Sequence, residues 1–383
     1  MTLIADSEAL AAFCARLASP YITVDTEFMR DRTYYPQLCL VQIAGADEAA
    51  AIDALAPGLD LAPLIALMDR RDILKVFHAG RQDVEIFYLL SGRVPAPMFD
   101  TQIAAMVCGF GESVGYDTLV AKLTGAHIDK SSRFTDWSLR PLTERQTKYA
   151  ISDVTHLRTV YEKLSRRLEH SGRAAWLEEE MAVLADPATY STAPEDAWLR
   201  LKPRSTSGRF LVVLKALAAW RETEAQRRNL PRNRVLRDEA LTEIAAHHPA
   251  NADELARTRG LSRGFAEGRM GEAILATVAQ ALALPETAWP APPPRVELPR
   301  DMGAVVELLK VLLKMQCDVH NVAAKLVASS ADIELIAADD DAAVRALRGW
   351  RREVFGEAAL KLKRGELSLG LEGKTLKLIA RRT

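Results

Sequence analysis

The stretch Ile22-Thr23-Val24-Asp25-Thr26-Glu27-Phe28 is an apolar, β-branched run that ends in two carboxylates. This composition predicts a β-strand, and residues two apart on a strand point to the same side. Asp25 and Glu27 therefore face one way, separated only by Thr26. Two adjacent anions repel one another unless a cation or a shared proton lies between them. An isolated Asp-x-Glu is most often a solvated strand end, so its meaning depends on the rest of the chain.

The composition excludes several classes of protein. A chain of 383 residues is too long for one typical domain and predicts two or three. The formal net charge is −1, so any surface that binds nucleic acid must be a local one. We expect no membrane span and no secretion signal, since no apolar run is long enough and the first residues lack a basic segment. The four scattered cysteines include no Cys-x-x-Cys pair, which predicts reduced thiols in a cytoplasmic protein.

The first part of the chain alternates between strand and helix patterns. Two strands follow the first one at short turns, which suits an antiparallel meander. Further on, buried-type strands alternate with amphipathic helices, so we predict a mixed sheet with flanking helices. The predicted helices cover 7–18, 61–68, 83–90, 117–124 and 143–170, and the predicted strands cover 22–28, 38–43, 49–53, 73–77 and a short segment from 98.

The rest of the chain is predicted to be helical, with interruptions. Trp289-Pro290-Ala291-Pro292-Pro293-Pro294-Arg295 is typical of a stiff polyproline segment. Near the end, leucines alternate with polar residues on both sides of Glu372-Gly373-Lys374, which predicts a β-hairpin. We therefore place a first domain at 1–180, a linker or strap at 181–204, a helical bundle at 205–285, a Pro-rich linker at 286–299 and a second helical module with the hairpin at 300–383.

Two further acidic positions lie in the first domain. Asp83 follows a buried strand, in Phe77-His78-Ala79-Gly80-Arg81-Gln82-Asp83, and begins the next helix. Asp153 lies one helical turn after Tyr149, on the same face of the long helix. Each has an ordinary interpretation: a carboxylate favoured by the helix dipole, or a core tyrosine hydrogen-bonded to a neighbouring acid. His78 is more typical of a structural or phosphate-facing residue than of a metal ligand.

Asp25, Glu27, Asp83 and Asp153 have no basic partner within their own motifs. Four carboxylates brought together are strongly unfavourable without cations. Hard oxygen ligands suit Mg²⁺ or Mn²⁺ rather than Zn²⁺. Two such ions roughly 3.5–4 Å apart stabilise both the attacking and the leaving oxygen of an in-line displacement at phosphorus. We therefore predict a site for two divalent cations.

The order of these residues resembles the tyrosine branch of the DEDD exonuclease superfamily, and longer phrases over most of residues 1–170 resemble ribonuclease D. The resemblance implies a ribonuclease-H-like exonuclease domain and two divalent metals. It also implies release of nucleoside 5′-monophosphates from RNA 3′ ends, usually those of transfer RNA precursors. The phrases are Asp25-Thr26-Glu27-Phe28, Thr33-Tyr34-Tyr35-Pro36-Gln37-Leu38, Lys75-Val76-Phe77-His78-Ala79, Asp129-Lys130-Ser131, Thr135-Asp136-Trp137 and Arg140-Pro141-Leu142.

By this resemblance the four carboxylates hold the metals and Tyr149 positions the attacking water. An ordinary tyrosine pKa near 10 makes a poor base at pH 7, so we expect the metal to activate the water and Tyr149 to orient it. Weaker candidates for substrate binding could stack on a base or contact phosphate, but Phe28 and Trp137 could equally be packing residues. These candidates are Phe28, Met29, His78, Lys130 and Trp137, with Arg133 beside them.

Residues 205–285 resemble the helicase-and-RNase-D C-terminal (HRDC) module, in Leu214–Arg221, Asn229–Leu236 and Leu261-Ser262. Between Ala197 and Arg237 about eleven basic residues stand against two acidic ones. A surface for a nucleic-acid backbone needs such an excess, although a structural bundle with a solvated face would also show it. Residues 300–383 resemble a second, more diverged copy around Arg348-Gly349-Trp350-Arg351, and the hairpin departs from that module.

The leading hypothesis is a metal-dependent 3′-to-5′ exoribonuclease that acts as a monomer, without an obligate protein partner, on RNA 3′ ends such as those of transfer RNA precursors. A DNA exonuclease of the same superfamily stays open, because the sequence does not reveal contacts to the 2′-hydroxyl. A non-catalytic nucleic-acid-binding scaffold is the other alternative. The complete set of four carboxylates and Tyr149 argues against it.

Overall fold

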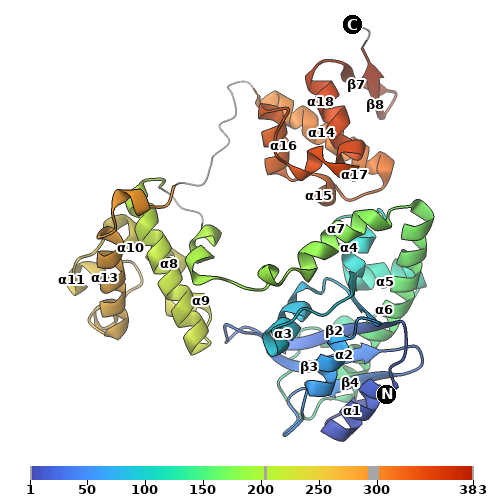
Figure 1. Cartoon of the computed structure of the whole chain (residues 1–383), viewed down its shortest axis with the longest axis horizontal. Coiled ribbons are helices and arrows are strands. Elements are labelled where there is room, and N and C mark those ends of the chain that lie inside the picture. The colour runs from blue at the N-terminus through green and yellow to red at the C-terminus, as the bar shows by residue number, and fades with distance from the viewer. Residues whose placement is uncertain (1, 202–204, 292–301, 382–383) are drawn as a thin grey trace. The chain divides into compact units, whose positions relative to one another are not determined.

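The computed structural model describes residues 2–201, 205–291 and 302–381 (Figure 1). Contacts within these ranges divide the chain into two compact units. One unit comprises Met1–Glu27, Leu40–Thr189 and Arg295–Thr383, and the other comprises Phe28–Cys39 and Tyr190–Pro294. None of the helices in the described ranges combines the length and the apolarity needed to cross a bilayer.

A six-stranded mixed sheet lies at the centre of the N-terminal domain, in the order β1-β4-β3-β2-β5-β6. Strands β3 and β4 pair antiparallel, whereas β1 with β4, β2 with β5 and β5 with β6 pair parallel. The predicted mixed sheet is therefore confirmed, with β1 as a short strand that the sequence pattern did not reveal. The strands are β1 (Thr2–Ile4), β2 (Tyr21–Met29), β3 (Gln37–Ala44), β4 (Ala49–Asp53), β5 (Leu74–Phe77) and β6 (Met98–Asp100).

Helices flank this sheet, and the longest, α6, runs alongside it (Figure 1). A capping box between Thr143 and Gln146 begins α6, and Gly172, in the left-handed region with a φ of 66°, ends it. One face of α6 is apolar and buried, and Asp153 lies on that face. The helices are α1 (Ser7–Arg16), α2 (Ala62–Asp69), α3 (Arg81–Ser91), α4 (Thr101–Val107), α5 (Tyr116–Thr124), α6 (Glu144–Ser171) and α7 (Ala174–Ala185), with the 3₁₀ turn η1 (Lys130–Ser132).

The segment assigned from sequence to a linker, 181–204, contains the last turn of α7 and two short 3₁₀ helices. These are η2 (Pro187–Thr189) and η3 (Pro194–Arg200), and residues 202–204 lie outside the described ranges. The polyproline-type segment predicted at 289–295 also lies outside the described ranges from residue 292 onward. The four cysteines are free thiols, and all are buried.

The HRDC-like bundle belongs to the second unit. Leu214 and Leu217 of α8 are fully buried in one apolar cluster with Leu241, Ile244 and Ile274. The elements are α8 (Gly208–Arg228), α9 (Arg232–Val235), α10 (Asp238–His247), α11 (Ala252–Leu255), α12 (Arg263–Ala266), α13 (Arg269–Leu282) and the 3₁₀ turn η4 (Glu286–Ala288).

The second helical module ends in the predicted β-hairpin. Strands β7 (Leu367–Glu372) and β8 (Thr375–Ala380) pair antiparallel, with Gly373 at a positive φ of 60° in the turn between them. The helical elements are α14 (Gly303–His320), α15 (Ala324–Val327), α16 (Ser330–Ala338), η5 (Arg345–Leu347), α17 (Gly349–Arg351), the π-helical η6 (Arg352–Gly356) and α18 (Glu357–Lys363). With the mixed sheet and the HRDC-like bundle, this confirms the predicted fold class.

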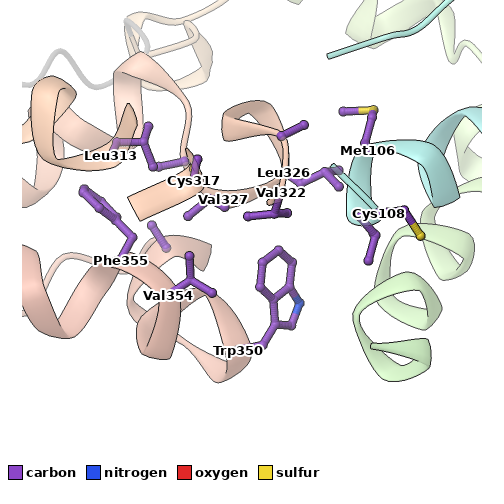
Figure 2. Close-up of a cluster of buried hydrophobic side chains, with 14 of the residues drawn as sticks. Met106, Cys108, Leu313, Cys317, Val322, Leu326, Val327, Trp350, Val354 and Phe355 are labelled. Atoms are coloured by element: carbon purple, nitrogen blue, oxygen red, sulfur yellow. The ribbon is translucent and has the colours of Figure 1, made fainter. Parts of the chain in front are cut away.

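This second module packs on the N-terminal domain through a shared hydrophobic core. Met106 and Cys108, from α4 and the residue that ends it, lie in one cluster with Cys317, Leu326 and Trp350 of the module (Figure 2). The Trp350 ring stacks on Trp176 of α7, with ring centroids 4.2 Å apart. Ala323 donates a backbone hydrogen bond of 3.0 Å to the Met106 carbonyl. Because both parts contribute buried side chains, each part on its own would expose this apolar surface to water.

Candidate active site

Three of the predicted carboxylates converge where β2 meets α6. Asp25 and Glu27 lie two residues apart on β2, and Asp153 comes from the buried face of α6. Each of the three residues has a carboxylate oxygen that could bind a metal ion, and these three oxygens all lie within 4.8 Å of one another. The alternation of the strand and the periodicity of the helix produce this arrangement, since each directs its acid toward the same point.

Asp83 lies beside these three residues. It is in the first turn of α3, directly after β5, and β5 is the parallel neighbour of β2. Its side chain is buried and accepts a hydrogen bond from the hydroxyl of Thr26, the residue between Asp25 and Glu27. The charge of Asp83 also raises the pKa values of Asp25 and Glu27. Thr26 is thus a contact residue of the cluster, whereas in the sequence it is only a spacer.

Burial raises the pKa of every carboxylate in the cluster, and repulsion between the acids adds to this for Asp25 and Glu27. Burial and then the charges of Asp83, Asp153 and Glu27 raise the pKa of Asp25 well above its ordinary value. Burial, followed by the charges of Asp153 and Asp83, raises the pKa of Glu27 to about 9. Burial raises the pKa of Asp153 to about 7 and that of Asp83 to about 6. Near neutral pH the cluster therefore holds protons that a bound cation would displace.

Tyr149 lies one turn before Asp153 on α6, and their side chains are hydrogen-bonded. Burial and the neighbouring acids Asp153, Glu27 and Asp25 raise the pKa of Tyr149, so its hydroxyl stays protonated at neutral pH. Trp137 is only 2% exposed, and the centroid of its ring lies 6.2 Å from the centroid of the Tyr149 ring. Tyr149 also lines a surface cavity of about 520 Å³ together with Lys148 and Ser152. This volume is within the range of small-molecule sites.

Two further residues contact the cluster or carry a charge near it. The hydroxyl of Tyr116 donates a hydrogen bond to the backbone carbonyl of Asp153, in the turn of α6 that carries this acid. The exposed Arg133, one of the candidates for phosphate contact, lowers the pKa values of Glu27 and Asp153 through its charge. Nothing in the local sequence points to Tyr116, because its partner is distant in the chain.

The weaker substrate-binding candidates lie in different environments. Phe28 and Met29 end β2 and are half-buried. Lys130 forms an ion pair of 2.6 Å with Asp117. His78 has its Nδ1 3.0 Å from the Thr101 hydroxyl oxygen, and its Nε2 is buried with no hydrogen-bond partner in the described part of the chain. Trp137, the last of these candidates, packs beside Tyr149.

The acidic cluster fits a divalent cation. All of its potential ligands are carboxylate oxygens, which hard cations prefer. Asp153 Oδ1 is buried and has no hydrogen-bond partner among the described residues, so it is left with an unused lone pair. The raised pKa values of Asp25 and Glu27 show that the cluster lacks sufficient positive charge of its own.

Comparisons with known proteins match both the N-terminal domain and the HRDC-like bundle. Residues 1–169 match the family model described as 3′-5′ exonuclease, and residues 210–278 match the HRDC domain. The ribonuclease D of Granulibacter bethesdensis is 58% identical over 99% of this chain and 96% of its own length. That of Gluconacetobacter diazotrophicus is 56% identical over 98% of this chain and 96% of its own length.

Among solved structures, the chain is similar to Escherichia coli RNase D, which is described as an exoribonuclease involved in structured RNA processing. The two are 35% identical with a TM-score of 0.81, over 95% of this chain and 98% of that one. The resemblance seen in the sequence is confirmed, and it favours the exoribonuclease over the DNA exonuclease and the non-catalytic scaffold. The chain belongs to the ribonuclease D family of 3′-5′ exoribonucleases.

Proposed function

We propose that this exoribonuclease shortens transfer RNA precursors from their 3′ ends and releases nucleoside 5′-monophosphates. The observation that carries the proposal is the convergence of Asp25, Glu27 and Asp153 within 4.8 Å, with Asp83 beside them. An uncompensated group of carboxylates is the kind of site that phosphodiester hydrolysis with divalent cations requires.

We assign the ligands of the cations to these residues. Asp25, Glu27 and Asp153 would hold one divalent cation, Mg²⁺ or Mn²⁺, and Asp83 would complete the ligand set for a second one. When bound, such cations supply positive charge to the reacting phosphate and lower the pKa of water. Thr26 holds the Asp83 carboxylate in place through its hydroxyl, and the Tyr116 hydroxyl holds the backbone of Asp153.

Tyr149 has a positioning role in this proposal. Its hydroxyl is protonated at neutral pH and is hydrogen-bonded to Asp153, so it is a poor proton acceptor. The hydroxyl oxygen can still accept a hydrogen bond from a water molecule and so orient that water toward the scissile phosphate. Trp137 packs beside the Tyr149 ring, with the ring centroids 6.2 Å apart. Arg133, at the exposed edge, carries the charge that a phosphate group would meet there.

We also propose that the enzyme works as a monomer in the cytoplasm. The acidic cluster is assembled from residues of one chain, so no second copy is needed to complete it. The four buried free thiols suit a reducing compartment.

The test is an assay on a transfer RNA precursor that carries extra 3′ nucleotides and a 5′ label. With Mg²⁺ or Mn²⁺ we expect a ladder of products shortened one nucleotide at a time, which stops near the mature 3′ end and disappears on addition of EDTA. An unstructured RNA of equal length serves as a comparison and should be degraded further. Internal cleavage, or shortening that EDTA does not stop, would contradict the proposed chemistry. Equal degradation of both RNAs would contradict the proposed substrate.

A further inference from the structure

An aromatic side chain that no packing explains lies in the segment between η1 and α6. Phe134 is 90% exposed, more than any other large apolar side chain in the described ranges. Because its ring is almost entirely in water, it contributes little to the stability of the fold. Single exposed apolar residues are common on protein surfaces, so the surroundings of the ring decide what it does.

The backbone that carries Phe134 is anchored on both sides. The backbone N–H of Thr135 donates a hydrogen bond of 3.2 Å to the carbonyl of Ser132, which closes a turn with Arg133 and Phe134 at its centre. The side chain of Gln146, in the first turn of α6, donates a hydrogen bond of 3.2 Å to the Thr135 hydroxyl. Ser132 itself is buried. The exposed ring is therefore attached to a backbone that α6 holds in place.

This turn lies beside the acidic cluster, within the same compact unit of the chain. Trp137 follows Phe134 by three residues, and its ring lies next to that of Tyr149, with 6.2 Å between the centroids. Three residues of chain extend over at most about 11 Å, whatever their conformation. The charge of Arg133 reaches the cluster, since it lowers the pKa values of Glu27 and Asp153.

Arg133 and Phe134 form a pair of a cation and an aromatic ring. The guanidinium carbon of Arg133 lies 5.1 Å from the centroid of the Phe134 ring. Arg133 forms no ion pair within the described ranges, so its guanidinium is available to an anion from solution. A positive charge suits the phosphate of a nucleotide, and an exposed ring face suits its base. The two adjacent side chains together match the chemistry of one nucleotide.

The other aromatic residue of this segment cannot take the same role. Trp137, a sequence-based candidate for stacking on a base, is only 2% exposed and packs beside Tyr149. Its ring faces are covered by the protein. Between η1 and α6, Phe134 is therefore the residue whose ring a base can reach from solution.

We propose that Phe134 is a stacking platform for a nucleobase near the 3′ end of the RNA, and that Arg133 contacts a phosphate of the same strand. The inference rests on the proposed function for the identity of the ligand. Stacking on an aromatic ring tolerates every base, because each base has a π face. Such a platform holds RNA 3′ ends of any sequence beside the acidic cluster.

The test separates contacts to bases from contacts to phosphates. The full-length protein in EDTA is titrated with two 5′-labelled probes, and binding is followed by fluorescence anisotropy at several salt concentrations. One probe is an oligoadenylate of eight nucleotides, and the other is an oligomer of eight abasic sugars with the same phosphodiester links. The variants are Phe134→Ala, Phe134→Trp and Arg133→Gln. Leu371→Ala is the matched control, because Leu371 is a 76% exposed apolar residue on the distant hairpin strand β7.

We expect Phe134→Ala to bind the oligoadenylate about tenfold more weakly and the abasic oligomer as tightly as the wild type does. Phe134→Trp should keep the wild-type affinity for both probes. Arg133→Gln should weaken both and lower the slope of log K against log salt by about 0.7, the value for one phosphate contact with a single strand. The control should bind as the wild type does. All of these residues are exposed, so melting temperatures should stay the same.

Two results would overturn the proposal. One is wild-type affinity of Phe134→Ala for the oligoadenylate, and the other is an equal loss for both probes, which would mean that the ring does not contact a base. The binding assay does not depend on catalysis. If the wild type fails to shorten RNA but Phe134→Ala loses affinity for the oligoadenylate alone, the proposed function fails and the stacking platform stands. If the wild type shortens RNA and Phe134→Ala has the same KM, the proposed function stands and the platform is wrong.

Discussion

Two clusters of charged side chains can be compared. One surrounds Arg351, where the second helical module packs on the N-terminal domain, and the other is the acidic cluster of the N-terminal domain. They differ in whether opposite charges within the chain compensate their own. Around Arg351, which is 2% exposed, Glu179 and Glu180 pair with the guanidinium, and Leu326 accepts a further hydrogen bond of 2.7 Å. Arg345 also pairs with Glu180. The acidic cluster consists of Asp25, Glu27, Asp83 and Asp153. Here, by contrast, the pKa values of the carboxylates are raised, because burial disfavours their charged forms.

The difference separates a structural cluster from a functional one. Charges that are paired within the chain stabilise a contact and need no ligand. Like charges that are buried together destabilise the fold unless a cation joins them, so their presence indicates a function. Burial of charged side chains does not by itself indicate a functional site. Buried charges that are not compensated by opposite charges within the chain do indicate one, and the following experiments test that distinction.

The largest effect is expected for Asp153→Asn. Losing one carboxylate from the acidic cluster should remove several kcal/mol of transition-state stabilisation, which corresponds to about a 10³-fold lower kcat on RNA. Thermal stability should not fall, because a repulsive charge is lost as well. Asp72→Asn, an exposed acid paired with Arg70, is the control and should leave kcat unchanged. A variant at Asp153 with ordinary activity would mean that the acidic cluster is structural after all.

The next largest effect is expected for Arg351→Met, which should destabilise the protein by about 3 kcal/mol. The change removes the buried guanidinium and leaves Glu179 and Glu180 with only the exposed Arg345, beside the Trp176–Trp350 stack. The neighbouring Arg352→Met is a matched control, since Arg352 is 54% exposed and should cost less than about 0.5 kcal/mol. Thermal unfolding measures both. Similar melting temperatures for the two variants would show that the Arg351 cluster does not hold the second module.

A smaller loss is expected for Tyr149→Phe, which removes only the hydroxyl that we propose orients the attacking water. We expect kcat to fall by about 10- to 100-fold, because a positioning hydrogen bond is lost while the carboxylates stay in place. Calorimetric titration with Mn²⁺ should give wild-type affinity and stoichiometry. Unchanged turnover would exclude the positioning role, and lost Mn²⁺ binding would make Tyr149 part of the metal site instead.

The smallest effect concerns pH and stability in EDTA. In the folded protein the pKa is raised to about 6 for Asp83, about 7 for Asp153 and about 9 for Glu27. Acids shifted in this direction contribute stability below the pKa of the unfolded state, which is near 4. That stability is lost as the pH rises through the folded values. The melting temperature of the metal-free protein should therefore fall by a few degrees between pH 6 and 9, and less so for Asp153→Asn. Mn²⁺ should restore it, with release of protons. Identical pH profiles for the two proteins would show that the buried acids do not cause the loss of stability.

The parts of the fold that were predicted depend on local patterns. Strand alternation placed Asp25 and Glu27 on one side, and helix periodicity placed Tyr149 and Asp153 on one face. The leucine alternation around Gly373 predicted the hairpin for the same reason. Strand β1 was missed, because its three residues carry no period and its pairing partner, β4, is distant in sequence.

The contacts that complete each site could not be predicted, because they join residues far apart in the chain. Thr26 with Asp83, and Tyr116 with Asp153, are such contacts. The same holds for Arg351 with Glu179. In each case the residue types are ordinary, and only the fold brings them together.

The most direct test of the acidic cluster is a crystal of the protein soaked in Mn²⁺ and measured at the manganese absorption edge. We predict anomalous density bound by the carboxylates of Asp25, Glu27 and Asp153, with further density against Asp83, and no such density in a crystal of Asp153→Asn. Manganese bound elsewhere on the molecule, with the four carboxylates left without density at a pH where the enzyme is active, would contradict the account.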